Sequence, residues 1–133
     1  MAYEESLREI SLNADATVGI YTGVPGLPGS ASPNNGKQYC FVKLTGERTV
    51  GLATGAAGEL VAGVLQNKPQ SVGAAAAVGF SGVSKVQVGT VAVAAGAAVV
   101  ADANGCAITG AAGRAVALAS GAAGSIIPIL LLG

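Results

Sequence analysis

The feature that most restricts the fold of this chain is the way in which glycine-rich turns divide it into short apolar runs. One such turn, Gly-Ala-Ala-Gly, occurs at residues 55–58, 110–113 and 121–124, each time between two apolar runs. Glycine adopts the positive backbone torsions that tight reversals need, and alanine keeps the loop thin. The turns therefore predict compact corners between strands, which we expect to be hairpins. Their uneven spacing disfavours a solenoid of identical repeats.

The region from Lys37 to Gly133 consists of short apolar runs separated by turn residues, as is typical of a small all-β domain. Apolar runs fall at residues 38–44, 48–53, 59–66, 76–82, 84–90, 90–94, 97–109, 114–119 and 125–132. Asn104 and Gly105 can both take the positive torsions of a tight hairpin turn. The regular strand spacing predicts an all-β fold, a small β-barrel or a β-sandwich, with helix limited to a turn or two near the N-terminus.

Residues 1–36 differ from the remainder of the chain. Pro25, Pro28 and Pro33 fix their own backbone torsions, donate no hydrogen bond to a strand ladder and favour extended neighbours. We therefore predict two parts, an extended N-terminal arm over residues 1–36 and a β-rich domain over residues 37–133. Since the predicted strands begin after the arm, removal of residues 1–20 is expected to leave the β-rich domain folded.

The arm carries a net charge of −3 and residues 37–133 a net charge of +3. This asymmetry predicts that the arm orders against a neighbouring copy or another partner; a solvated acidic tail is the alternative. An apolar contact through Tyr3, Leu7 and Ile10 would be flanked by acidic groups that meet basic ones. The candidate contact residues are Tyr3, Glu4, Glu5, Leu7, Arg8, Glu9, Ile10 and Tyr21.

The reactive side chains give no catalytic pattern. The sequence has no histidine, which removes the commonest general base and the usual partner of a catalytic Ser or Cys. Glu47, Glu59 and Asp102 lie beside glycines in expected turns, where we interpret them as turn-stabilising groups. The glycines at 51–58 lack the Gly-Lys-Ser/Thr ending of a phosphate loop, and no set of residues has metal-ligand spacing. We therefore expect no enzyme activity, no cofactor and no metal.

The distribution of charge and of apolar residues bears on partners and location. The seven basic residues are dispersed, which disfavours nucleic-acid binding. The run at 125–132 is too short to span a bilayer, and the first ten residues are acidic where a secretory signal is basic and then apolar. We expect no nucleic-acid or membrane partner and synthesis in the cytoplasm. Cys40 and Cys106 are then predicted to be packed thiols, with a disulfide as the alternative.

The low charge content predicts self-association. Only 11% of the residues are charged, whereas 51% are hydrophobic. A monomer of this composition would expose much apolar surface, and extensive apolar surface usually marks contacts. We therefore predict a homo-oligomer.

The order of turns and strands resembles the decoration, or cement, proteins of tailed-bacteriophage capsids. The resemblance rests on "VAGVLQNKP", "AAVGFSGVSKVQVG", "AAGAAVVADANGCAI" and "GAAGSIIPILLL", which together cover most of residues 59–133. It implies a small tulip-like β-domain with an N-terminal arm. It also implies a homotrimer, with a dimer as the alternative, and the major capsid protein as partner on the outer surface of the virion. Its implied role is stabilisation of the capsid. The competing hypotheses are a phage fibre or adhesin head and a small enzyme subunit.

Overall fold

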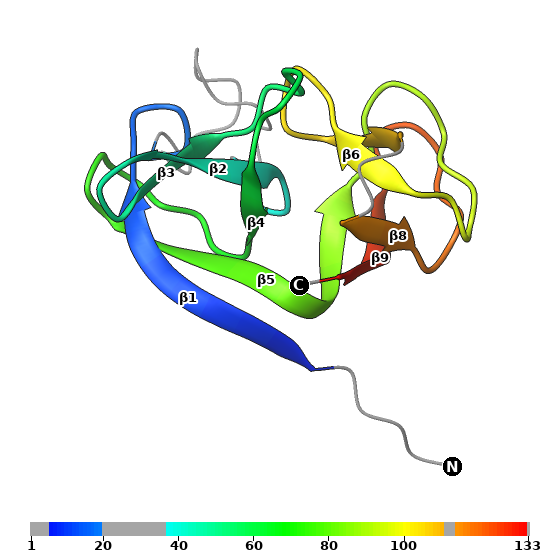
Figure 1. Cartoon of the computed structure of the whole chain (residues 1–133), viewed down its shortest axis with the longest axis horizontal. Helices are drawn as coiled ribbons and strands as arrows, with labels where there is room; N and C mark the ends of the chain where they lie inside the picture. The colour runs from blue at the N-terminus through cyan, green and yellow to red at the C-terminus, as the bar shows by residue number, and fades with distance from the viewer. Residues whose placement is uncertain (1–5, 20–36, 111–113, 133) are drawn as a thin grey trace.

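The computed structural model describes residues 6–19, 37–110 and 114–132 (Figure 1). This part of the chain consists of strands, turns and loops and contains no helix. The strands are β1 (Leu7–Ala14), β2 (Phe41–Gly46), β3 (Thr49–Leu52), β4 (Val61–Leu65), β5 (Ala75–Gln87), β6 (Val99–Ala101), β7 (Ala107–Thr109), β8 (Ala115–Ala117) and β9 (Ile126–Leu131). The predicted all-β fold is confirmed.

Five of the strands close into a barrel. They follow one another in the order β1, β3, β2, β4 and β5, and β1 also pairs with β5, which completes the ring. The β1–β3 pair is parallel, and the other pairs of the ring are antiparallel. The structure thus selects the small β-barrel from the two predicted architectures. Closure reduces the length of unpaired strand edge that an open sheet would leave to solvent.

The barrel interior is narrow and is filled by small and branched side chains. A ring of so few strands encloses little space, and the valine-rich and alanine-rich sequence suits it. The buried residues that form this barrel core are Ala14, Val18, Val42, Val50, Leu65, Ala76 and Val78.

Strand β5 continues past the barrel and organises a second unit. Its residues Gly82–Gln87 pair with β9, which pairs in turn with β8, while β6 and β7 form a separate hairpin. Figure 1 shows β5 running along β1 and then turning sharply upward beside β9. The turn is possible at Gly82, whose φ of +108° favours glycine and where a Cβ would overlap the backbone of Ser6.

We call residues 83–110 and 114–132 the C-terminal lobe. Its core is continuous with one side of the barrel, because Phe41 and Val64 from barrel strands pack into it. The buried residues of this core are Phe41, Ala53, Val64, Val86, Val88, Val93, Val99, Ala101, Ala107, Ala115, Ala117, Ile127, Ile129 and Leu131.

The expectation that the strands begin only after residue 36 is wrong for Leu7–Ala14. This segment is β1, which pairs with β5 over Leu7–Asn13 and with β3 at Asn13 and Ala14. Most of this strand faces solvent and therefore carries charged and polar side chains. A search for apolar runs does not detect such a strand. Residues 1–5 and 20–36, the remainder of the predicted arm, lie outside the described residues.

The turns differ in part from the predicted hairpins. The Gly55–Gly58 turn connects β3 to β4, which both pair with β2, so it crosses over one strand. The 121–124 turn does join the antiparallel neighbours β8 and β9, and most of the 110–113 turn lies outside the described residues. The β6–β7 hairpin around residues 102–106 is confirmed. Its turn places only Gly105 at positive φ, so the expected positive torsion of Asn104 is wrong.

Two further strand predictions are corrected by the sheet. Residues 76–82 and 84–90, expected as separate strands, contribute to the single bent strand β5. Residues 90–94 form no strand and make one isolated bridge, between Val93 and Gly121. Among the described residues, no helix is long and apolar enough to cross a membrane.

Candidate interaction surfaces

The outer edge of β1 is an unpaired strand edge. One side of β1 is hydrogen-bonded to β5 along Leu7–Asn13, but β3 meets the other side only at Asn13 and Ala14. Within the described part of the chain, residues 7–12 therefore have no strand neighbour on that side. An open edge presents backbone N–H and C=O groups that can pair with an added chain. We call this surface the β1 edge.

The β1 edge carries half of the predicted contact residues. Arg8, Glu9 and Ile10 are exposed, with Ile10 at 45% of its maximal accessibility. Leu7 is half-buried and packs against the core of its own molecule. The side chains at this edge thus combine one exposed branched apolar group with a cation and an anion. The other predicted contact residues, Tyr3, Glu4, Glu5 and Tyr21, lie outside the described residues.

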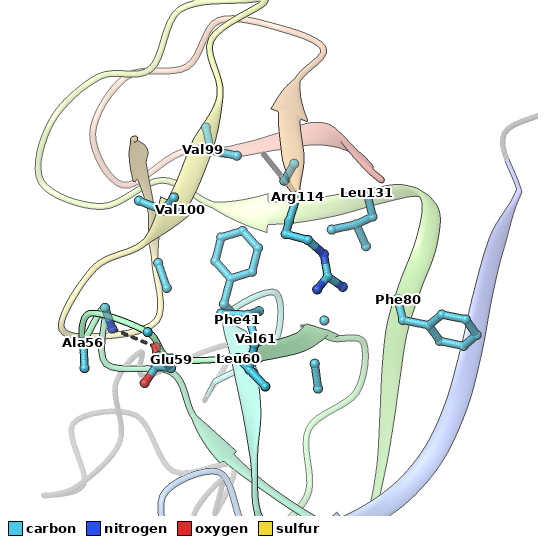
Figure 2. Close-up of a pocket in the computed structure, with 16 residues that line it drawn as sticks. Phe41, Ala56, Glu59, Leu60, Val61, Phe80, Val99, Val100, Arg114 and Leu131 are labelled. Carbon is cyan, nitrogen blue, oxygen red and sulfur yellow. Dashed lines mark hydrogen bonds between the residues drawn. The ribbon is translucent and has the colours of Figure 1, made fainter. Parts of the chain in front are cut away.

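A second surface is an apolar recess between the barrel and the C-terminal lobe, shown in Figure 2. Its volume is about 410 Å³. Phe41 lies in it, and Val99 and Leu131 line it from the lobe, while Leu60 at its rim is 82% exposed. The full lining is Phe41, Gly55, Ala56, Gly58, Glu59, Leu60, Val61, Ala62, Gly63, Phe80, Val99, Val100, Ala101, Arg114, Ala115 and Leu131.

Arg114 supplies a cation to this otherwise mostly apolar recess. Figure 2 shows its guanidinium group extending across the opening between Phe41 and Phe80. Among the described residues, no carboxylate lies within ion-pair distance of Arg114. Glu59, the acidic group of the lining, forms its ion pair with Lys43. An apolar recess with one exposed guanidinium suits an apolar side chain next to a carboxylate on a partner protein.

Glu59 holds the wall of the recess by closing the Gly55–Gly58 turn. Its carboxylate accepts hydrogen bonds from the backbone N–H groups of Thr54 and Gly55 and from the Thr54 hydroxyl, at 2.8–3.1 Å. It also forms an ion pair of 2.9 Å with Lys43, and its side chain is only 6% exposed. Burial raises the pKa of Glu59, but the ion pair and the hydrogen bonds outweigh it and lower the pKa to about 2. The carboxylate is therefore a fixed structural anion.

This depressed pKa predicts a pH-dependent contribution of Glu59 to stability. The folded-state pKa of about 2 lies below the ordinary value of 4.5. The stabilisation is therefore fully present above pH 4.5 and is lost as the pH falls toward 2. We expect Glu59→Gln to lower the free energy of unfolding by about 2 to 3 kcal/mol at pH 6 and by much less near pH 2. Urea denaturation at pH 6, 4 and 2.5 measures this difference.

Glu47→Gln is the matched control for this experiment, because Glu47 is exposed in the β2–β3 turn. We expect that variant to unfold like the wild type at each pH. A Glu59→Gln variant with an unchanged or pH-independent stability would contradict the assigned role.

The turn roles predicted for Glu59 and Asp102 are confirmed. Asp102 accepts hydrogen bonds from the backbone N–H groups of Asn104 and Cys106, at 2.8 and 2.9 Å, and so shapes the β6–β7 turn. No group of three or more His, Cys, Asp or Glu side chains suited to a metal occurs in the described ranges.

The sequence reasoning did not identify the recess, because Phe41, Val99 and Leu131 are distant in sequence and each resembles an ordinary strand residue.

Comparisons with known proteins leave the family of the chain open. No protein-family model matches the sequence, and a search of curated proteins gives no significant match.

Proposed function

We propose that this protein is a structural virion protein that binds the outer surface of a phage capsid. In this role it bridges neighbouring major capsid proteins and so stabilises the shell. We propose the capsid as the partner because of the resemblance over residues 59–133 to capsid decoration proteins. The chemistry of the described surfaces supports a role in protein contact.

The observation that carries the proposal is the β1 edge. The strand is held rigidly on the barrel by β5, so its free side requires little ordering on binding. Backbone groups along residues 7–12 can add a partner segment by strand pairing, and Ile10 adds an apolar contact beside the charges of Arg8 and Glu9. A weak contact of this kind, repeated over a symmetric shell by a multivalent protein, gains strength through avidity.

Self-association is part of the proposal. Exposed large apolar side chains are spread over both units of the fold and include Leu44, Leu60, Val72 and Val91. The recess with its Arg114 adds a second surface suited to a protein partner. We propose a homotrimer in which some of these groups are covered by neighbouring copies, since closed symmetry covers identical patches without forming open fibres.

Co-sedimentation with capsids tests the proposed function. Purified protein is mixed with capsids assembled from the major capsid protein of the virus that encodes it, and the bound fraction is measured at several salt concentrations. We expect the wild type to bind to saturation. Ile10→Asp should bind at least about tenfold more weakly, because it places a charge at the centre of the contact.

Leu118→Asp is the matched control, because Leu118 is exposed, at 46%, nearly as much as Ile10, but lies on the C-terminal lobe outside the β1 edge. It is expected to bind as the wild type does. Wild-type protein that stays in the supernatant under all conditions would reject the capsid as partner. Equal binding of the wild type and the Ile10→Asp variant would reject the β1 edge as the contact.

A further inference from the structure

Cys40 and Cys106 bring two free thiols together from the two units of the fold. Cys40 immediately precedes β2 of the barrel, and Cys106 ends the β6–β7 turn of the C-terminal lobe. The backbone N–H of Phe41 donates to the carbonyl oxygen of Gly105 at 2.7 Å, so the two cysteines lie on directly adjacent stretches of backbone. Each thiol lies close enough to shift the pKa of the other, and the Cys106 Sγ also lies 3.9 Å from the Asn104 carbonyl oxygen.

Both stretches of backbone are held in place by their own hydrogen bonds. The Cys40 N–H donates to the Lys37 carbonyl at 3.1 Å, and the Cys40 carbonyl accepts from the Leu65 N–H at 2.9 Å. The Cys106 N–H donates to the Asp102 carboxylate at 2.9 Å. Backbone stretches joined by a direct hydrogen bond place facing residues at about the Cα spacing found in disulfides, so we expect a bond to need mainly a change of side-chain torsion.

We propose that Cys40 and Cys106 form an intramolecular disulfide when the folded protein meets a small-molecule disulfide such as oxidised glutathione. The Cys106 thiolate attacks one sulfur of the oxidant, which forms a mixed disulfide and releases one glutathione thiolate. Cys40 then loses its proton and attacks the Cys106 sulfur, which releases the second glutathione. The two protein thiols thus lose two electrons and two protons, and one oxidised glutathione becomes two reduced molecules.

The different surroundings of the two thiols determine which of them reacts first with the oxidant. Cys106 is half-buried and reachable from solvent, whereas Cys40 is buried. Interaction with the Cys40 thiol lowers the pKa of Cys106 despite burial and the nearby Asp102, and Lys37 acts in the same direction. The same interaction, together with burial, raises the pKa of Cys40. The accessible thiol is therefore the one that reacts first with an external oxidant, and the buried thiol resolves the mixed disulfide.

The bond would join the barrel to the C-terminal lobe. It closes a loop that runs from residue 40 to residue 106 and restricts the unfolded chain over that length. A loop of this size predicts a rise of roughly 10 °C in the unfolding temperature of the oxidised protein. This inference does not depend on the proposed capsid role.

Oxidation of the purified full chain tests the proposal. The reduced protein is incubated with oxidised glutathione, remaining thiols are alkylated, and the intact mass and a non-reducing tryptic digest are measured. We expect the loss of two hydrogen atoms per chain and a linked pair of peptides, residues 38–43 and 86–114. Thermal unfolding should show the rise in temperature, and a reductant should reverse it.

Two variants serve as controls. Cys106→Ser changes a half-buried side chain, so this variant should keep the fold and the reduced-state unfolding temperature but form no intramolecular disulfide. Cys40→Ala should react only as far as the mixed disulfide on Cys106. Wild-type protein that stays fully alkylated, that stops at the mixed disulfide, or that links two chains would overturn the proposal. An oxidised wild type without a higher unfolding temperature would overturn the predicted stabilisation by this cross-link.

Discussion

A chain that begins at residue 21 is expected not to fold, in contrast to the prediction made from the sequence. The truncation removes β1, which closes the barrel by pairing with both β3 and β5. It also removes Ala14 and Val18 from the barrel core that they share with Val50 and Val78. A domain of this size has a free energy of unfolding of about 5–15 kcal/mol, and the loss of the strand that closes the barrel exceeds such a margin.

The segment after β1 strengthens this expectation. Asp15 accepts a hydrogen bond of 2.8 Å from the Thr45 hydroxyl, and the Leu52 N–H donates to the Thr17 hydroxyl at 2.8 Å. These bonds join residues 15–17 to β2 and β3, so they are lost together with the strand.

Circular dichroism during heating measures the effect of this truncation. The shortened chain should show no cooperative transition, whereas a chain lacking only residues 1–5 keeps the pairing of β1 with β3 and β5 and should melt as the full chain does. A cooperative transition of the shorter chain near the full-length unfolding temperature would show that β1 is dispensable.

Gly63→Val is expected to destabilise the barrel by about 4 kcal/mol or more. Gly63 lies in β4, where a Cβ would overlap the carbonyl oxygen of Gly79 in the neighbouring β5 and would meet a Val78 methyl group at 3.0 Å. Because the obstacle is backbone, no rotamer change relieves it, and β4 has to move away from β5. The pair β4–β5 belongs to the closed ring, so this movement opens the barrel.

The matched control is Gly46→Val at the end of β2. A Cβ there meets only the Thr49 Cβ at an ordinary 3.7 Å, and the position is exposed. Urea denaturation of both variants should give a large loss of stability for Gly63→Val and a change within about 1 kcal/mol for Gly46→Val. Similar losses in the two variants would mean that strand glycines act here through backbone entropy and not through close packing.

The local part of the fold could be predicted from the sequence. Short apolar runs between glycines correspond to β2, β3, β4 and β9, because these strands bury at least part of a face against the cores. The β6–β7 hairpin was found because its turn chemistry lies within a few residues, with Asp102 and Gly105 supplying the hydrogen bonds and the positive torsion.

The closure of the barrel could not be predicted in this way. β1 carries Arg8 and Glu9 and pairs with a strand far along the chain, so neither its hydropathy nor its neighbours in sequence indicate its place. Gly82 resembles the end of a strand, but in the structure it is the point at which β5 bends from the barrel to the lobe. The recess has the same origin, since barrel closure and this bend together bring Phe41 near Val99 and Leu131.

A reconstruction of virus particles with and without the gene tests the central claim most directly. The account predicts additional density on the outer surface of the wild-type capsid, over the junctions between capsid subunits, into which the barrel fits with its β1 edge toward the shell or a neighbouring copy. Threefold symmetry of that density would identify the trimer. Identical capsid surfaces in the two particles, or additional density only at the tail or its fibres, would contradict the account.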